Sequence, residues 1–279
     1  MQNQAFMKSG NNSVRMHYKW WRLLIIGAIT YIMGIIVLMF TLNTNIFPSV
    51  VILGNFLIPV TYVAFFYERR KLSHVNMYST AMSFFSGGFL GTLAAAVLEP
   101  IFIQNFSFET AIEIGIIEEF AKILAVLFIL RKEQYRMQRD GIILGAAAGM
   151  GFAALESCGY AFTAFLNSGG SLSLTVYITL IRGILSPLGH GTWTAILAGV
   201  LLRERSPKRL HFNTKVIAAY VTVVLLHGFW DGLPSIVSIF TPSCIAVTLS
   251  EIAVGAVGII ILIGLWRESK RQVERLDIL

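Results

Sequence analysis

Eight ionisable residues lie inside stretches of the sequence that are otherwise apolar. A charged side chain at the centre of a bilayer costs roughly 2.5–3.5 kcal/mol, so such groups are expected to face one another, a wet cavity or a metal ion. Carboxylates and imidazoles gathered in this way can hold a divalent cation or move protons to and from water. The eight residues are Glu118, Glu119, Lys122, Glu156, Arg182, His190, His227 and Asp231.

The first group combines two adjacent glutamates with one lysine. Lys122 follows Glu118 by four residues and Glu119 by three, so its ammonium group can reach either carboxylate on one face of a helix. Adjacent residues point about 100° apart on a helix. The two carboxylates are therefore expected to have different tasks, with Lys122 fixing the pair.

The second group is spread over three later segments. His227 and Asp231 are four residues apart, a spacing that suits two ligands of one metal or a carboxylate that orients a histidine. Glu156 has no ionisable partner on its own helix, so its partner must come from another one. Pro187 is expected to kink its helix just before His190 and to open room there.

The elements that must position these residues are predicted to be membrane-spanning helices. Hydrophobic residues make up 56% and charged residues 13% of the 279 positions, and the mean hydropathy is +0.71. Soluble domains carry about 25% charged residues. Apolar runs of about twenty residues cross a bilayer as helices, and the lack of two-residue alternation excludes a closed barrel. An all-α bundle of eight spans is predicted: Trp21–Leu42, Val50–Tyr67, Ser79–Leu98, Ala111–Leu130, Gly141–Leu166, Leu174–Leu202, Val216–Phe240 and Cys244–Trp266.

The distribution of basic residues predicts the orientation of the bundle. Apart from Lys122 and Arg182, every Lys and Arg lies in the N-terminal flank, in alternate loops or in the tail, and the four opposite loops contain none. Basic loops face the cytoplasm. We therefore expect a single multi-pass domain over residues 1–279 in the cell membrane, with a flank (1–19) and a tail (267–279) that are both cytoplasmic. The net charge of +7 then reflects topology and contact with lipid headgroups, and no nucleic-acid partner is expected.

Depth and helix packing predict that the ionisable residues converge. They fall in four consecutive spans at a similar depth, from the centre to the outer half of the membrane. Gly141, Gly145 and Gly149 form a small-residue face that allows close helix packing and draws Glu156 towards its neighbours. The sequence therefore predicts one shared polar cavity, with the functional core between residues 111 and 233.

At this point the ordered motifs resemble those of a known family. Glu118-Glu119-Phe-Ala-Lys122 matches an EExxK motif and Phe152-Ala-Ala-Leu-Glu156 matches FxxxE. His190 follows on the next span, and then His227 and Asp231 match HxxxD. This set resembles the PrsW family of intramembrane proteases, within the wider group of CAAX-processing and bacteriocin-processing membrane proteases. That wider group usually has a histidine where Glu156 stands, which favours the PrsW branch.

The resemblance implies hydrolysis of a peptide bond in a membrane-anchored protein, such as site-1 cleavage of an anti-sigma factor. In the preferred assignment His190 and His227 bind Zn²⁺, with Asp231 or Glu156 as third ligand, while Glu118 or Glu119 is the general base. In a metal-free version, a glutamate and His190 activate water, and His227 and Asp231 polarise the carbonyl group. Both versions stay open at this point.

Two functions of other classes compete with proteolysis. Buried acidic, basic and histidine side chains also form proton relays, as in a proton-coupled transporter or channel. The sequence shows no inverted repeat and no paired broken helices in corresponding halves, which are typical of transporters. A non-catalytic membrane scaffold with a polar core would explain the glycines but not the clustered glutamates and histidines. The sequence therefore favours a peptidase that cuts near the extracytoplasmic face.

Overall fold

The computed structural model describes residues 19–276 except 72, 133, 207, 208 and 242, and within these residues the chain is helical and contains no strand. Two short 3-10 segments, η1 and η2, accompany the α-helices. The elements in chain order are α1 (Trp20–Thr41), η1 (Thr44–Ile46), α2 (Phe47–Glu68), α3 (Met77–Phe102), α4 (Phe108–Leu130), α5 (Gln138–Asn167), α6 (Leu172–Leu185), η2 (Ser186–Leu188), α7 (His190–Arg203), α8 (Thr214–Phe240) and α9 (Cys244–Leu276).

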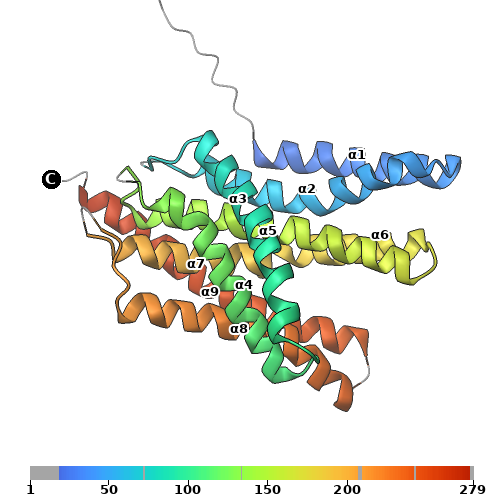
Figure 1. The fold of residues 1–279 in the computed structure, drawn as a ribbon. Coiled ribbons are helices and arrows are strands. Elements are labelled where there is room, and N and C mark those ends of the chain that lie inside the picture. Colours follow the sequence, from blue (N-terminus) through green and yellow to red (C-terminus); the bar gives the residue numbers. More distant parts are fainter. Residues whose placement is uncertain (1–18, 72, 133, 207–208, 242, 277–279) are drawn as a thin grey trace, which may run out of the picture.

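The helices run back and forth along one long direction. Figure 1 shows the α2–α3, α4–α5 and α7–α8 connections at one end of the bundle, on the left of the view. The α1–α2, α5–α6 and α8–α9 connections lie towards the other end, and α3 and α4 cross the bundle obliquely. The loops rich in Lys and Arg therefore share one end, as the alternation of basic loops predicts. That this end faces the cytoplasm stays a prediction.

Seven helical segments among the described residues are long and apolar enough to cross a membrane. One of them, Leu172–Arg203, comprises α6, η2 and α7 together. The predicted span over Leu174–Leu202 is confirmed as one membrane-crossing segment, and the break that the sequence predicts at Pro187 takes the form of η2. The remaining predicted span corresponds to α4, a helix of 23 residues that packs against α3, α5 and α8 and carries the Glu118, Glu119 and Lys122 group.

Helix α5 forms the centre of the bundle, and glycines allow its close contact with α7. A Cβ atom at Gly149 would overlap the carbonyl oxygen of His190, and one at Gly145 would overlap that of Thr194. On its other side, a Cβ at Gly151 would overlap the carbonyl oxygen of Phe84 in α3. Only glycine permits such backbone contact. The glycine face predicted from the sequence therefore fixes the start of α7, where His190 lies.

Candidate active site

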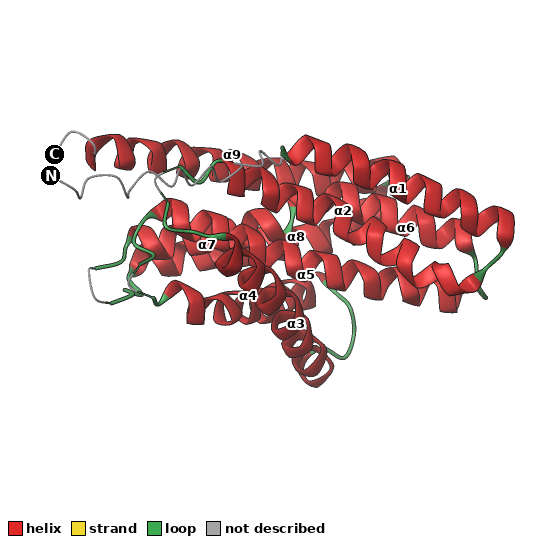
Figure 2. Ribbon diagram, turned by 90° about the horizontal axis from the view of Figure 1, so that it is seen from above, coloured by secondary structure: helices red, strands yellow, loops and turns green. Residues whose placement is uncertain are grey.

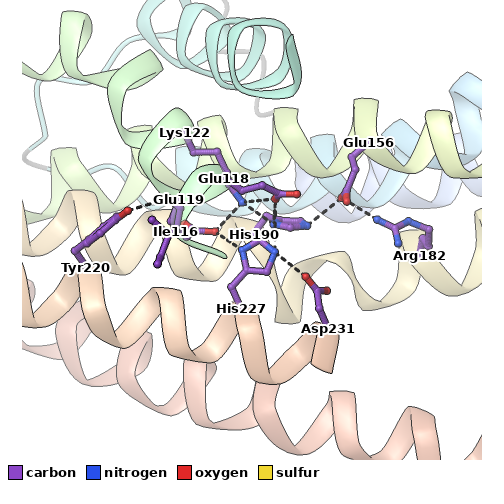
Figure 3. Close-up of polar contacts among 10 residues, drawn as sticks. All are labelled: Ile116, Glu118, Glu119, Lys122, Glu156, Arg182, His190, Tyr220, His227 and Asp231. Atoms are coloured by element: carbon purple, nitrogen blue, oxygen red, sulfur yellow. Dashed lines mark hydrogen bonds and ion pairs between the residues drawn. The ribbon is translucent and has the colours of Figure 1, made fainter. Parts of the chain in front are cut away.

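Helix α4 supplies the centre of a buried polar cluster. Glu118, Glu119 and Lys122 are 5%, 0% and 0% exposed, respectively. The Nζ atom of Lys122 lies 2.7 Å from Oε1 of Glu119 and 3.2 Å from Oε2 of Glu118. Figure 3 shows the ammonium group between the two carboxylates. Lys122 thus neutralises part of their charge, as the spacing on the helix predicts.

Helix α8 brings His227 and Asp231 to the same cluster. Nδ1 of His227 lies 3.0 Å from Oε1 of Glu119, so the carboxylate of Glu119 orients this ring from behind. Nε2 of His227 then faces Oδ2 of Asp231 at 3.2 Å and Oε2 of Glu118 at 3.6 Å. The two helices approach this closely at Gly115, where a Cβ atom would lie 2.9 Å from the carbonyl oxygen of Val224.

Helices α5, α6 and α7 complete the cluster. His190 is the first residue of α7, directly after Gly189, and its Nδ1 lies 2.8 Å from Nζ of Lys122. Its Nε2 lies 3.0 Å from Oε2 of Glu156 on α5. The same oxygen of Glu156 lies 2.8 Å from Nη2 of Arg182 on α6. Glu156 therefore finds both of its ionic partners on other helices, and all eight ionisable residues belong to one network (Figure 3).

Three of these residues have the types and spacing of a metal site. The donor atoms of Glu118, His190 and His227 lie within 4.8 Å of one another, and they form the candidate metal group of the described part of the chain. Two histidines and one glutamate are a common ligand set of catalytic Zn²⁺, so the residues fit a zinc ion. Asp231, a predicted ligand, contacts Nε2 of His227 and lies outside this group. The ammonium group of Lys122 contacts two of the three donors, so these donors already face a positive charge in the structure.

A small cavity of about 70 Å³ opens beside His190. It extends towards Arg182 and Glu251, and its other lining residues include Ser157 and Trp230. One buried water needs about 10–15 Å³, so the cavity can hold several. Glu251 lies seven residues after the start of α9, towards the end of the bundle opposite the basic loops. The cavity therefore has room for water beside His190, on the side of the cluster nearer that end.

Arg182 and Glu99 have no catalytic or metal-binding role predicted from the sequence, although Arg182 is expected to pair with a carboxylate or with Glu251. Arg182 is recognised in the sequence as a buried charge, and the structure adds that it holds Glu156 and donates to Oγ of Ser157 at 3.2 Å. Glu99 lies in the last turn of α3, one residue beyond the predicted span that ends at Leu98, and its carboxyl group interacts with Glu118. A helix end predicted four residues later would have marked Glu99 as an additional acid within the span, and the structure shows it partly buried.

An all-helical membrane bundle with carboxylates and imidazoles gathered in one buried network, beside a cavity with room for water, has the groups that a membrane-embedded hydrolase needs. The model of the PrsW family intramembrane metalloproteases matches residues 76–265, which include the whole cluster. The chain belongs to this family. It is similar to Protease PrsW from Halalkalibacterium halodurans, with 26% identity over 176 residues that cover 61% of this chain and 77% of the relative. No solved structure matches this chain significantly.

Membership of this family decides between the classes of function that the sequence leaves open. The chain is a peptidase and a multi-pass protein of the cell membrane. The comparisons give no support to a transporter.

Proposed function

We propose that this peptidase cuts a membrane-anchored protein close to the extracytoplasmic face, and that its substrates include an anti-sigma factor. The observation that carries the proposed site is the meeting of Glu118, His190 and His227 from three helices at one point next to a cavity. The type of substrate rests on the resemblance of the motifs to the PrsW family. The side of cleavage rests on the lining of the cavity, which includes Glu251 near the start of α9. Figure 1 shows the α8–α9 connection away from the end that carries the basic loops.

The chemistry of amide hydrolysis suggests a role for each side chain. We assign Glu118, His190 and His227 as the residues that hold a zinc ion, which when bound polarises the scissile carbonyl group and acidifies water. Glu119 holds His227 through Nδ1 and so keeps Nε2 directed at the reaction centre. Lys122 holds Glu119 in place.

Proton transfer needs a carboxylate or imidazole that reaches both the attacking water and the leaving amine. Glu118 and Glu156 are the carboxylates next to His190, at 3.8 and 3.0 Å from its ring nitrogens. With Glu118 holding the metal, Glu156 is the carboxylate that can take the proton from water and return it to the amine. In the metal-free version, Glu118 and His190 activate the water, while His227 and Asp231 polarise the carbonyl group. In both versions we place the scissile bond next to the same three side chains, those of Glu118, His190 and His227.

Cleavage by the purified protein tests this proposal. The protein is placed in lipid vesicles with a single-pass membrane substrate, with and without a zinc chelator, and its metal content is measured alongside. We expect cleavage that the chelator removes and that added Zn²⁺ restores, with the bound zinc lost in His190→Ala. Cleavage that survives chelation but not Glu118→Gln would support the metal-free version. Full cleavage by both variants would contradict the proposed site.

The nature of the substrate is tested separately in cells. In cells from which the gene for this protein is deleted, a membrane-anchored anti-sigma factor should stay at full length under the stress that normally triggers its cleavage. Restoring the wild-type chain should bring the shortened form back, and restoring Glu119→Gln should not. An anti-sigma factor that is shortened equally in the deletion strain would exclude it as the substrate.

A further inference from the structure

A second and much larger cavity, of about 890 Å³, lies between α1, α2 and α9. It is separate from the active-site cavity, with which it shares no lining residue. Its lining reaches Pro187 of η2 on one side and includes Arg69, Lys71 and Lys270 on the other, and we call this basic side, near the basic loops, its mouth. Figure 2 shows α1 and the end of α9 along the same edge of the molecule. The volume lies in the range of about 300–1,000 Å³ that is typical of ligand sites.

The deep part of this cavity is apolar. Leu24 of α1, Ile58 of α2, and Leu262 and Ile263 of α9 line it. Ile263 is 44% exposed at its edge, on a helix that faces the bilayer. A cavity with such walls beside the hydrocarbon core is suited to acyl chains. A soluble ligand would gain little from these walls and would have to reach them through lipid.

The mouth of the cavity is strongly basic. Arg69, Lys71, Arg139 and Lys270 line it, and Trp20 and Trp266 lie beside them at the level where aromatic residues meet lipid headgroups. The single lining acid, Glu68, is engaged, because its carboxylate accepts the backbone N–H of Trp20.

Arg139 provides an independent sign of an anion site. It is 95% buried, since its exposed fraction is 5%, and its Nε atom has no hydrogen-bond partner among the described residues. Its Nη1 atom donates to the carbonyl oxygen of Lys71 at 2.7 Å, and its guanidinium group lies 5.1 Å from the ring centroid of Trp266. A buried guanidinium N–H without a partner is costly, and a bound phosphate oxygen would satisfy it.

We propose that this cavity is a binding site for an anionic phospholipid. The phosphate group lies among Arg139, Lys71 and Lys270, and the acyl chains run along the apolar walls of α1, α2 and α9. The basic mouth selects the negative headgroup, and the apolar depth selects a lipid over a soluble phosphate compound. A transmembrane helix of another protein could pack against the apolar walls, but it would not neutralise the cluster of cations at the mouth. The site does not depend on the proposed cleavage reaction.

Native mass spectrometry of the detergent-purified protein tests the headgroup. Phosphatidylglycerol and phosphatidylcholine with identical acyl chains are titrated against the wild type and two double variants. The first double variant, Lys71→Gln with Lys270→Gln, removes two cations from the mouth of the cavity. The second, Arg267→Gln with Arg271→Gln, removes two exposed cations near the end of α9 that do not line the cavity. Each basic residue near an anionic lipid contributes about fivefold in affinity, so we expect a loss of roughly 25-fold in the first double variant. The second should bind phosphatidylglycerol as the wild type does.

A pair of isoleucine variants tests whether the acyl chains of the lipid lie along the apolar walls of the cavity. Ile263→Trp adds bulk to the cavity wall, whereas Ile260→Trp adds it at a position on the same helix, 69% exposed, that does not line the cavity. We expect the first to lower phosphatidylglycerol binding at least tenfold and the second to leave it unchanged. Excess glycerol phosphate should not displace the lipid. Equal binding of both lipids by the wild type, equal loss in the two double variants, or displacement by glycerol phosphate would overturn the proposal.

Discussion

At the scale of single residues, Lys122 is the charge that holds the cluster together. Its ammonium group contacts Glu118, Glu119 and His190, and it lies 4.2 Å from the ring centroid of Phe152. A fully buried lysine is tolerated only with such partners, and the carboxylates in turn depend on it. Lys122 is therefore expected to contribute to the stability of the protein and to hold the side chains of the site in place.

Replacing this lysine is expected to destabilise the protein. Lys122→Met leaves two buried carboxylates without their cation, at a cost of about 3–5 kcal/mol. The double variant Lys122→Met with Glu119→Gln removes one of these charges and should recover part of the loss. Thermal unfolding in detergent measures both. An unfolding temperature of Lys122→Met equal to that of the wild type would show that the ion pairs carry no stability.

Arg182 is expected to affect the rate without affecting the fold. Its side chain is 30% exposed, so its loss is tolerated more easily than that of Lys122, but it holds Glu156 against His190. Residues that orient the groups of an active centre typically contribute 10–100-fold. Arg182→Met should lower kcat by about this factor at normal abundance, and Arg182→Lys should recover part of it. An unchanged kcat in Arg182→Met would leave Arg182 with no role in positioning Glu156.

The sequence predicts which residues meet, but not how they divide the work. Ionisable groups cannot face lipid cheaply, and this alone predicts that five residues come together: Glu119, Glu156, His190, His227 and Asp231. The sequence predicts Asp231 or Glu156 as the third ligand, whereas the donor group of the structure contains Glu118. That difference depends on helix rotation and side-chain rotamers, which the spacing along one helix does not determine. Glu99 was missed for a simpler reason, since helix ends are predicted only to within a few residues.

At the scale of the elements, the contact of α5 with α7 positions His190. Gly149 faces the His190 carbonyl oxygen so closely that no larger residue fits without moving α7. The glycine spacing predicts that this face of α5 packs closely against another helix, but not that the partner is α7. Pro187 predicts the interruption next to it. It does not predict that α6 and α7 become separate helices, because that depends on how η2 packs against α2, α5 and α9.

Two glycine-to-alanine variants on the same helix test this contact. Gly149→Ala should lower stability by about 1–3 kcal/mol through overpacking and should reduce cleavage, because α7 is displaced. Gly159→Ala is the matched control, since a Cβ atom there meets nothing within 4 Å and alanine is the better helix former. Thermal unfolding and the cleavage rate are compared for both. Similar behaviour of the two variants would argue against close packing at Gly149.

At the scale of the whole molecule, the orientation in the membrane follows from charge. The basic loops share one end of the bundle in Figure 1, and we predict that this end and both termini are cytoplasmic. Reporter domains fused after Leu279 and into the loop at 167–173 measure this directly. The first reporter should be active only inside the cell and the second only outside. A C-terminal reporter found outside would reverse the orientation and move the predicted cleavage to the cytoplasmic side.

The central claim is that the buried cluster performs peptide hydrolysis, and one assay of substrate cleavage tests it most directly. Glu119→Gln removes the charge that orients His227, whereas Glu113→Gln makes the same change at an exposed position six residues earlier on α4. With equal amounts of protein in vesicles, Glu119→Gln should form no product from a single-pass substrate, as should His190→Ala. Glu113→Gln should match the wild type, and the cut should map to the extracytoplasmic side. Full activity in Glu119→Gln or His190→Ala would contradict the account.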